Sequence, residues 1–327
     1  MKTTPSPKVG ILLPTRGLVL KAQAEGRPVD AGPLLALAEQ AEEAGLDSVW
    51  VGDSLLSKPR LEPVTTLAAV AARTRRVRLG TAALLAALRH PVTLAQALAT
   101  VDIVSRGRLI VAGGVGGVFT PGQRQEWLTV GVDPASRASR LEEMVQVMKR
   151  LWTGEPVTFQ GRHFQLQDAV LQPTPAQPGG PPLLLACHHR TGATAQYRRA
   201  ARYADGFISI TDSPTEFAAV ASRVADCARE EGRDPANLDS AYYMTVNLDR
   251  DPDHARQEAH QFIVRYYGQD FWGNSWGPFG PPEVVARRIL EYAQAGARRV
   301  IVRFASLRQE EQLSLFVQEV LPTVRGD

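Results

Sequence analysis

The chain has 327 residues, of which 44% are hydrophobic and 22% charged, and its formal net charge is only +3. This length fits two average domains or one large α/β barrel, and this composition is typical of an ordinary globular chain rather than a disordered one. The basic residues are scattered and form no run interleaved with aromatic residues, which argues against nucleic acid as a partner.

The first ten residues carry no apolar signal core, and no stretch approaches the roughly 20 uncharged apolar residues that span a bilayer. We therefore expect no targeting segment and no membrane partner. The two cysteines, Cys187 and Cys227, lie 40 residues apart, in no spacing typical of a metal or redox site. These observations predict a cytoplasmic protein without structural disulfides.

Eight short runs of apolar and β-branched residues follow one another along the chain, with helical patterns between them. We predict a strand for each: Val9–Leu13, Ser48–Val51, Val77–Thr81, Leu109–Ala112, Leu183–Ala186, Phe207–Ile210, Ala241–Val246 and Val300–Phe304. Their continuous apolarity is typical of parallel strands that are buried on both faces. Eight such units predict a single (β/α)8 TIM barrel over residues 8–325, with a doubly wound sheet as the alternative. Residues 1–7 are expected to form a flexible N-terminal segment.

The same order of predicted secondary-structure elements appears near both ends of the chain. An amphipathic helix, a small residue with a glycine and a short strand follow one another in residues 34–51 and again in residues 283–304. Gly45 and Gly296 fit the left-handed residue that ends a helix. Helix and strand are therefore predicted to alternate as repeated units.

Two longer segments are predicted as insertions at the C-terminal face of the barrel rather than as domain boundaries. The first contains a strong helical pattern over residues 139–152 and a small hairpin around Gln160 and Gly161. The second, residues 266–282, is too aromatic for a solvated linker and too rich in glycine and proline for a helix. The helix and strand pattern resumes after each insertion.

The functional site of such a barrel lies at the carboxyl ends of its strands. The residues that follow the predicted strands are Pro14 to Arg16, Asp53 and Ser54, Thr81 to Ala83, Gly113 to Gly117, Cys187 to Thr194, Thr211 and Asp212, and Asn247. Few of these are acids or bases, and none has a recognisable metal-ligand spacing. We therefore expect an organic cofactor and no metal.

Several stretches of this chain together resemble the luciferase-like family of flavin- or deazaflavin-dependent oxidoreductases. They are residues 41–53, 79–114, 140–166, 198–209 and 316–326, so the resemblance covers nearly the whole chain. It implies a (β/α)8 barrel that carries FMN or its deazaflavin analogue, coenzyme F420. The combination of these stretches is more specific than any one of them.

The resemblance also implies a non-prolyl cis peptide bond at the end of the third strand, within Thr81, Ala82 and Ala83, where small side chains admit the cofactor ring. The alternative is that these residues only pack a tapering barrel. Gly114 and Val115 belong to the glycine-rich run after the fourth strand. They are predicted either to lie beneath the cofactor or to form a simple turn. This run lacks the third glycine of a dinucleotide-binding fingerprint, because Phe119 stands at that place.

The resemblance places the cofactor phosphate after the fifth strand, where backbone N–H groups at a helix start make a plausible anion site. The predicted cofactor contacts here are Cys187, His188, Arg190, Thr191, Gly192 and Thr194. The chain departs from the usual Gly-Gly-Asn-Ser pattern of the family, because Ala186 to His189 occupy this place. Since neighbours on a strand point to opposite faces, His188 and His189 are poor joint metal ligands. We expect one to be structural and the other to line the site.

Asp53 and His90 are the candidate catalytic residues. Relatives have an acid or a histidine near the flavin at the position of Asp53, but capping or an ion pair with a neighbouring arginine is an equal alternative. The histidine that follows it in many deazaflavin enzymes is Ser54 here, which argues against the usual histidine proton donor. For His90, helix capping is the alternative.

Arg16, Ser54, Trp272 and Trp276 are predicted to line the substrate pocket, with the aromatic insertion as a lid over the substrate end of the mouth and not over its phosphate end. A static loop or a dimer contact is the alternative for this insertion. Residues 273–277 also match the G-x-S-x-G elbow of serine hydrolases. That motif requires a strand before the serine and a helix after it, and neither pattern is present.

These features predict an oxidoreductase for a small-molecule substrate. The first hypothesis is a two-component monooxygenase that uses reduced FMN and oxygen and needs a separate reductase. The second is hydride transfer with the deazaflavin coenzyme F420, and the third is a barrel that binds flavin without turnover. The resemblance further implies a homodimer formed through the second and third helices.

Overall fold

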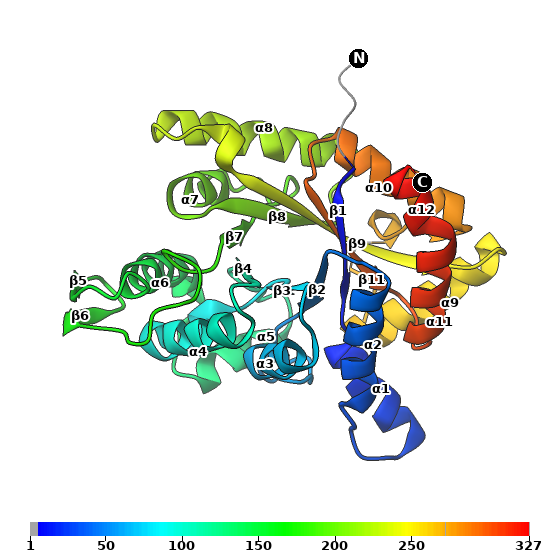
Figure 1. The fold of residues 1–327 in the computed structure, drawn as a ribbon, viewed down its shortest axis with the longest axis horizontal. Coiled ribbons are helices and arrows are strands. Elements are labelled where there is room, and N and C mark those ends of the chain that lie inside the picture. The colour runs from blue at the N-terminus through cyan, green and yellow to red at the C-terminus, as the bar shows by residue number, and fades with distance from the viewer. Residues whose placement is uncertain (1–5, 272, 327) are drawn as a thin grey trace.

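The protein is a closed barrel of parallel strands surrounded by helices, as the computed structural model shows (Figure 1). It describes residues 6–271 and 273–326, with only the backbone of residue 274. Residues 1–5, most of the predicted N-terminal segment, and Trp272 therefore lie outside the described residues. The strand order is β9-β11-β1-β2-β3-β4-β7-β8, and pairing of β8 with β9 closes the barrel. This confirms the predicted TIM-barrel fold.

All eight predicted strands are present, and all of their ends lie within two residues of the prediction. The barrel strands are β1 (Lys8–Leu12), β2 (Ser48–Val51), β3 (Arg78–Thr81), β4 (Leu109–Gly113), β7 (Leu183–Ala186), β8 (Gly206–Ile210), β9 (Asp239–Leu248) and β11 (Arg299–Phe304). The ninth strand of the same sheet, β10 (Phe279–Gly280), pairs with the C-terminal end of β9.

The interior of the barrel is filled by side chains, so it is a packed core and not a pore. Trp50 is completely buried there and its indole N–H donates to Ser48 Oγ at 2.8 Å. A Cβ on Gly80, on the neighbouring strand β3, would lie 2.0 Å from the Trp50 ring. Gly80 is therefore required by the bulk of Trp50. Leu12, Ile110, Leu184 and Ile301 complete this interior layer.

The helices cover the outside of the strands and bury most of the remaining apolar residues. They are α1 (Thr15–Glu25), α2 (Gly32–Glu43), α3 (Pro63–Arg73), α4 (Pro91–Val104), α5 (Pro121–Thr129), α6 (Arg137–Leu151), α7 (Ala195–Tyr203), α8 (Pro214–Glu230), α9 (Pro252–Tyr267), α10 (Pro282–Gln294), α11 (Gln309–Leu315) and α12 (Leu321–Arg325). Many begin with a proline, whose missing N–H has no partner to lose in the first turn. Gly45 and Gly296 follow α2 and α10 with positive φ, as predicted.

Both predicted insertions are present in the structure. Strands β5 (Val157–Gln160) and β6 (Gln165–Ala169) form an antiparallel hairpin outside α6, at the left edge of Figure 1. The aromatic insertion follows α9, forms a short 3-10 helix at Gly273–Ser275 and ends in β10. Among the described residues, no helix combines the length and apolarity needed to cross a bilayer.

Candidate functional site

Small residues line one side of the barrel mouth, at the carboxyl ends of β2, β3, β4 and β7. We call Gly52, Ala82, Ala83, Gly114 and Ala186 the glycine–alanine floor. A Cβ on Gly114 would lie 3.4 Å from Ala83 Cβ and 3.7 Å from Ala186 Cβ, and one on Gly52 would lie 3.7 Å from the Ala82 carbonyl oxygen. The floor is therefore continuous across the four strand ends and carries no side chain larger than a methyl group.

The side chain of Thr81 fixes the shape of the floor. The β3–β4 ladder ends at Gly80, and beyond it Thr81 Oγ1 both donates to the Ala112 carbonyl and accepts from the Ala112 N–H, each at 2.9 Å. Pairing resumes when Leu84 bridges to Gly113, so Ala82 and Ala83 bulge between these two points. The peptide bond between Ala82 and Ala83 is cis, as the family resemblance implied.

Asp53 and His90 both have structural partners beside the floor. Asp53 Oδ2 accepts the Leu85 N–H at 2.8 Å and Arg89 Nη1 at 2.6 Å, and Arg89 also contacts Glu62 at 3.0 Å. His90 is exposed and caps α4, since its Nδ1 accepts the Val92 N–H at 3.3 Å. The geometry thus shows the ion pair and the cap that were the alternatives to catalytic roles.

Ser54 belongs to a loop that is held by a buried carboxylate. Glu126 in α5 is 2% exposed, and its oxygens accept from Ser54 Oγ at 3.0 Å, from Ser57 Oγ at 2.8 Å and from the Leu56 N–H at 2.7 Å. Ser54 also accepts the Lys58 N–H at 3.0 Å. These bonds fix residues 54–58 over the barrel rim, and the sequence analysis did not identify Glu126.

The predicted phosphate loop lies between β7 and α7. Cys187 is fully buried against the helices, with Sγ 3.5 Å from the Gln196 carbonyl, so its side chain faces away from the barrel interior. Burial raises the pKa of its thiol. The Gln196 side chain accepts the His188 N–H at 2.9 Å and donates to Thr191 Oγ1 at 2.6 Å, which orders the start of the loop. Gly192 has a positive φ of 65°.

Arg190 is already paired in this loop. Its guanidinium contacts Glu216 of α8 at 3.3 Å and donates to the Ser275 hydroxyl of the aromatic insertion. Ser275 lies in a 3-10 helix and not in a strand-to-helix elbow, which agrees with rejection of the hydrolase motif. Thr194 stands before α7 and makes no side-chain cap. The insertion therefore contacts the predicted phosphate loop, contrary to the expectation that it covers only the substrate end.

His188 extends β7 on the interior face, two residues after Ala186. In the part of the chain that the structure describes, its Nδ1 is buried without a hydrogen-bond partner, and so is Asp212 Oδ1. Burial lowers the pKa of His188, and the Asp212 carboxylate opposes this shift. His189 points outward, with Nδ1 3.8 Å from Glu216. The two histidines thus face opposite sides, as predicted.

Arg303 is buried on the other side of the mouth from the floor. It lies on β11 two residues beyond Ile301, so it faces the barrel interior. It is 3% exposed and donates to Tyr267 Oη at 2.6 Å and to Thr245 Oγ1 at 2.8 Å. Its guanidinium carbon lies 5.0 to 5.4 Å from the ring centroids of Tyr243, Tyr266, Tyr267 and Trp276.

Three more cations gather on the same aromatic rings. Arg16 and Arg60 lie 5.3 and 5.7 Å from the Tyr266 centroid, and Lys58 Nζ lies 4.6 Å from that of Tyr267. Arg16 also donates to the carbonyl of Tyr266 at 2.8 Å and, from Nη1, to that of Pro59. We call Arg16, Lys58, Arg60 and Arg303 the cation cluster. Of its members, sequence analysis named only Arg16.

Trp276, a predicted substrate contact, is buried at the cation cluster. Its indole N–H donates to Asp270 at 2.9 Å and its ring stacks on Tyr267 with centroids 5.5 Å apart. The aromatic insertion thus packs directly over Arg303. A signal for Arg303 was present in the sequence, because a charged residue within a buried strand requires partners.

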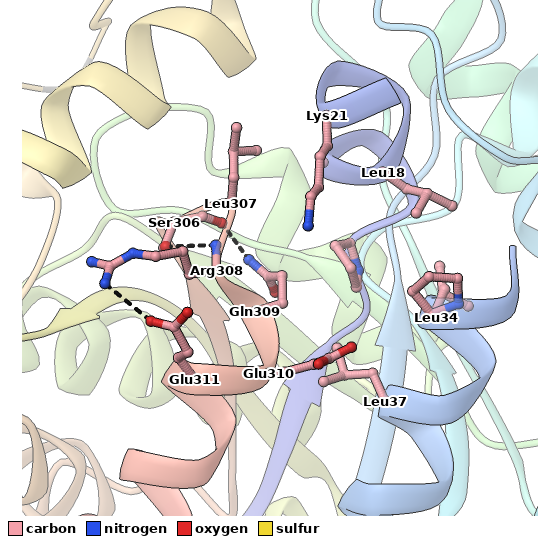
Figure 2. A pocket seen from close by; sticks show the side chains of 13 residues that line it. Leu18, Lys21, Leu34, Leu37, Ser306, Leu307, Arg308, Gln309, Glu310 and Glu311 are labelled. Carbon is pink, nitrogen blue, oxygen red and sulfur yellow. Dashed lines mark hydrogen bonds and ion pairs between the residues drawn. The ribbon is translucent and has the colours of Figure 1, made fainter. Parts of the chain in front are cut away.

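A separate hollow of about 180 Å³ lies between α1, α2 and the loop after β11. Figure 2 shows Lys21 of α1 and Glu310 of α11 among the side chains around it. Its lining includes Pro14, Leu34 and Ser306 but none of the floor residues. This hollow is therefore distinct from the mouth.

The mouth fits a flat tricyclic cofactor better than it fits a metal. A planar ring needs a surface from which no side chain projects, and the glycine–alanine floor provides this at the ends of β3, β4 and β7, with the Arg60 guanidinium against Gly52 at the end of β2. Within residues 6–271 and 273–326, no group of three or more His, Cys, Asp or Glu side chains could hold a metal ion.

Comparison with known proteins gives consistent results. The chain is 36% identical to the F420-dependent glucose-6-phosphate dehydrogenase of Beutenbergia cavernae, over 90% of this chain and 93% of that protein. It is 28% identical to the enzyme of the same name from Kineococcus radiotolerans, over 96% and 100% of the two chains. A solved monooxygenase from Streptomyces bottropensis is 26% identical and superposes with a TM-score of 0.79, covering 96% of this chain and 99% of its own.

The family model described as luciferase-like monooxygenase matches residues 8–277. That range includes seven of the eight barrel strands, the floor and most of the aromatic insertion. The resemblance drawn from the sequence is thereby confirmed. This chain belongs to the luciferase-like monooxygenase family, whose members are flavin- or F420-dependent oxidoreductases.

Proposed function

We propose that this protein is a deazaflavin-dependent oxidoreductase, which uses coenzyme F420 to exchange hydride with a small organic substrate. The observation that carries the proposal is the match, over 90% or more of the chain, to relatives named as F420-dependent dehydrogenases. The continuous floor of small residues supports a planar cofactor at the mouth. This favours our second sequence hypothesis over the FMN monooxygenase.

The chain's own residues would position the ring rather than react with it. Bound coenzyme F420 supplies a ring carbon that donates or accepts hydride. Ala82, Ala83 and Gly114 would contact its face, and Thr81 would hold their bulge in place through its two hydrogen bonds to Ala112. The aromatic insertion would exclude water from the far side.

His188 is the group that we propose to exchange the proton that accompanies hydride transfer. It follows Ala186 on the interior face, and its Nδ1 makes no hydrogen bond among the described residues. Because burial lowers its pKa, the ring is neutral near neutral pH and its free nitrogen can accept a proton. A His188→Gln variant should lose about a hundredfold or more in turnover, and the acid limb of the pH profile should disappear.

The cofactor phosphate is proposed to lie at residues 190–194, before α7. Arg190→Ala should then weaken binding of FMN and F420 about tenfold, because a charge-assisted phosphate contact is lost. Riboflavin, which lacks the phosphate, should bind both forms equally. Equal FMN affinity in the two proteins would move the anchor elsewhere.

A two-component monooxygenase remains the second candidate. The similar monooxygenase from Streptomyces bottropensis favours it, as does Ser54, which stands where many deazaflavin enzymes have a histidine. This function would require reduced FMN from a separate reductase.

Titration of the purified protein with coenzyme F420, FMN and reduced FMN, followed by fluorescence, tests the proposal. We expect coenzyme F420 to bind at least about tenfold more tightly than either form of FMN. Preferential binding of reduced FMN, with substrate-dependent oxygen consumption, would instead establish the monooxygenase. A protein that binds flavin but oxidises no substrate would fit the third hypothesis.

We also propose a cytoplasmic location, which the two unpaired thiols of Cys187 and Cys227 support. A homodimer through the second and third helices is a further proposal. Light scattering coupled to size exclusion tests the dimer.

A further inference from the structure

We infer that the cation cluster of Arg16, Lys58, Arg60 and Arg303 binds an anionic group of the substrate, a phosphate or a carboxylate. The inference deepens the proposed function, on which it rests for the placement of the cofactor at the glycine–alanine floor. It assigns the substrate to the opposite side of the mouth and predicts its chemical class.

The cluster lacks negative partners of its own. Among the described residues, none of its four members forms an ion pair with a carboxylate, whereas the half-buried Arg89, Arg199 and Arg299 do. The carboxylate that acts on Lys58 is Glu126, whose oxygens are occupied by the 54–57 loop. Asp270 faces the Trp276 indole. Four positive charges therefore converge without internal compensation.

Burial makes this imbalance costly, and a ligand would relieve it. Arg303 is 97% covered, yet its Nε has no hydrogen-bond partner among the described residues. Its other contacts are hydroxyl groups and aromatic rings, which do not neutralise its charge. A buried cation that is held in place without a counter-ion is a ready anion site, because its desolvation cost is already met in the folded protein.

Neighbouring titratable groups report the same positive field. Burial alone would raise the pKa of Tyr266, but Arg60, Arg303 and Arg16 together lower it. Burial, followed by repulsion from the three arginines, lowers the pKa of Lys58 to about 8. Both shifts stabilise the form with less positive charge, and a bound anion would oppose them because it reduces the positive potential of the cluster.

The cluster is adjacent to the floor. A Cβ on Gly52 would lie 2.6 Å from Arg60 Nη1 as well as near the Ala82 carbonyl, so the Arg60 guanidinium touches the edge of the floor. An anion held by the cluster would therefore place the rest of its molecule over the floor. This arrangement gives the anion an orienting role in addition to affinity.

Calorimetric titration with inorganic sulfate, a dianion that does not titrate near neutral pH, tests the inference on the full-length protein. It is performed without cofactor and with coenzyme F420 bound, at constant ionic strength. We expect saturable binding in both states and a loss of about tenfold or more in Arg303→Met and in Arg60→Gln. Arg229→Gln, which removes an equal but exposed charge from the far end of α8, should bind sulfate like the parent. Arg303→Lys should retain part of the affinity.

Absence of saturable sulfate binding, or equal affinity in parent, Arg303→Met and Arg60→Gln, would overturn the inference. These outcomes do not depend on whether F420 or FMN is the cofactor, so they are separable from failure of the proposed function. Should Arg303→Met not fold, Arg60→Gln and Lys58→Met decide the question.

The cofactor phosphate is the other possible source of the anion. If it occupied the cluster, Arg60→Gln would weaken FMN but not riboflavin, and bound FMN would abolish sulfate binding. That result would overturn the assignment to the substrate. The expected result is unchanged FMN and riboflavin affinity in Arg60→Gln and sulfate binding that persists with cofactor present.

Discussion

At the residue scale, the flat shape of the glycine–alanine floor depends on residues whose side chains are no larger than a methyl group. A Cβ on Gly114 would be at ordinary contact distance from Ala83 and Ala186, 3.4 and 3.7 Å, and its φ is not among the positive values. Gly114→Ala should therefore fold and bind cofactor within about threefold of the parent. Gly114→Leu should lose cofactor affinity by about a hundredfold, because its larger side chain extends over the floor.

Fluorescence titration measures both affinities, and thermal unfolding controls for folding. If Gly114→Leu binds as tightly as Gly114→Ala, the cofactor ring does not lie on this floor. Ala82→Leu is a poorer test, because Ala82 also packs in the barrel interior and overpacking there costs about 1–3 kcal/mol.

The total charge of the cation cluster depends on pH through Lys58. The folded protein lowers its pKa to about 8, chiefly by burial and then by Arg60, Arg16 and Arg303, so below pH 8 the fold carries a buried charge at a cost. Lys58→Met should raise the free energy of unfolding near pH 7 by about 1 kcal/mol. This gain is smaller than the whole pKa shift would give, because the Lys58 side chain is only half-buried.

This gain should shrink as pH rises from about 8 towards the unfolded value of 10.5, because there the parent releases its proton in the folded state but not in the unfolded state. Urea titrations of both proteins over this range provide the measurement. A constant difference would mean that Lys58 does not titrate near pH 8. Sulfate affinity should fall over the same range in the parent and not in Lys58→Met.

At the element scale, residues 54–57 are held by one carboxylate of α5, that of Glu126. Glu126→Gln replaces one acceptor oxygen by an amide, so part of the set formed with Ser54, Leu56 and Ser57 is lost. We expect a loss of about 2 kcal/mol in unfolding free energy and faster hydrogen exchange at the Leu56 amide. Glu230→Gln, an exposed change in α8, should alter neither. Unchanged exchange at Leu56 would mean that another contact holds the loop.

The elements themselves were predictable from local pattern, whereas the contacts between them were not. The hairpin at Gln160 and the helix ends at Gly45 and Gly296 are encoded by neighbouring residues, so they agree with the sequence. Glu126 lies 69 to 72 residues from the loop it holds, and Tyr267 lies 36 residues from Arg303. No local pattern specifies such pairs. For Asp53 and His90, local chemistry offered two roles, and the structure shows the ion pair and the cap.

At the scale of the whole molecule, the barrel closes around Trp50. Gly80→Ala would bring a methyl group within 2.0 Å of this ring and should destabilise the protein by at least about 2 kcal/mol. Trp50→Leu is also destabilising, but the double variant should be more stable than the sum of the two single changes predicts, because the smaller side chain leaves room for the methyl group. Denaturant unfolding of the four proteins gives the coupling. Strict additivity would show that Trp50 does not impose the glycine.

The position of Trp50 has an optical consequence. Its indole is wholly shielded from water and belongs to the same interior cluster as Ala82, so a chromophore on the floor would lie directly above it. Indole emission overlaps the absorption of flavins and deazaflavins, and energy transfer at such short range is efficient. Cofactor loading should therefore dim the part of the blue-shifted tryptophan signal that Trp50 contributes, beside the equally buried Trp127 and Trp152, which gives a label-free assay that needs no knowledge of the substrate.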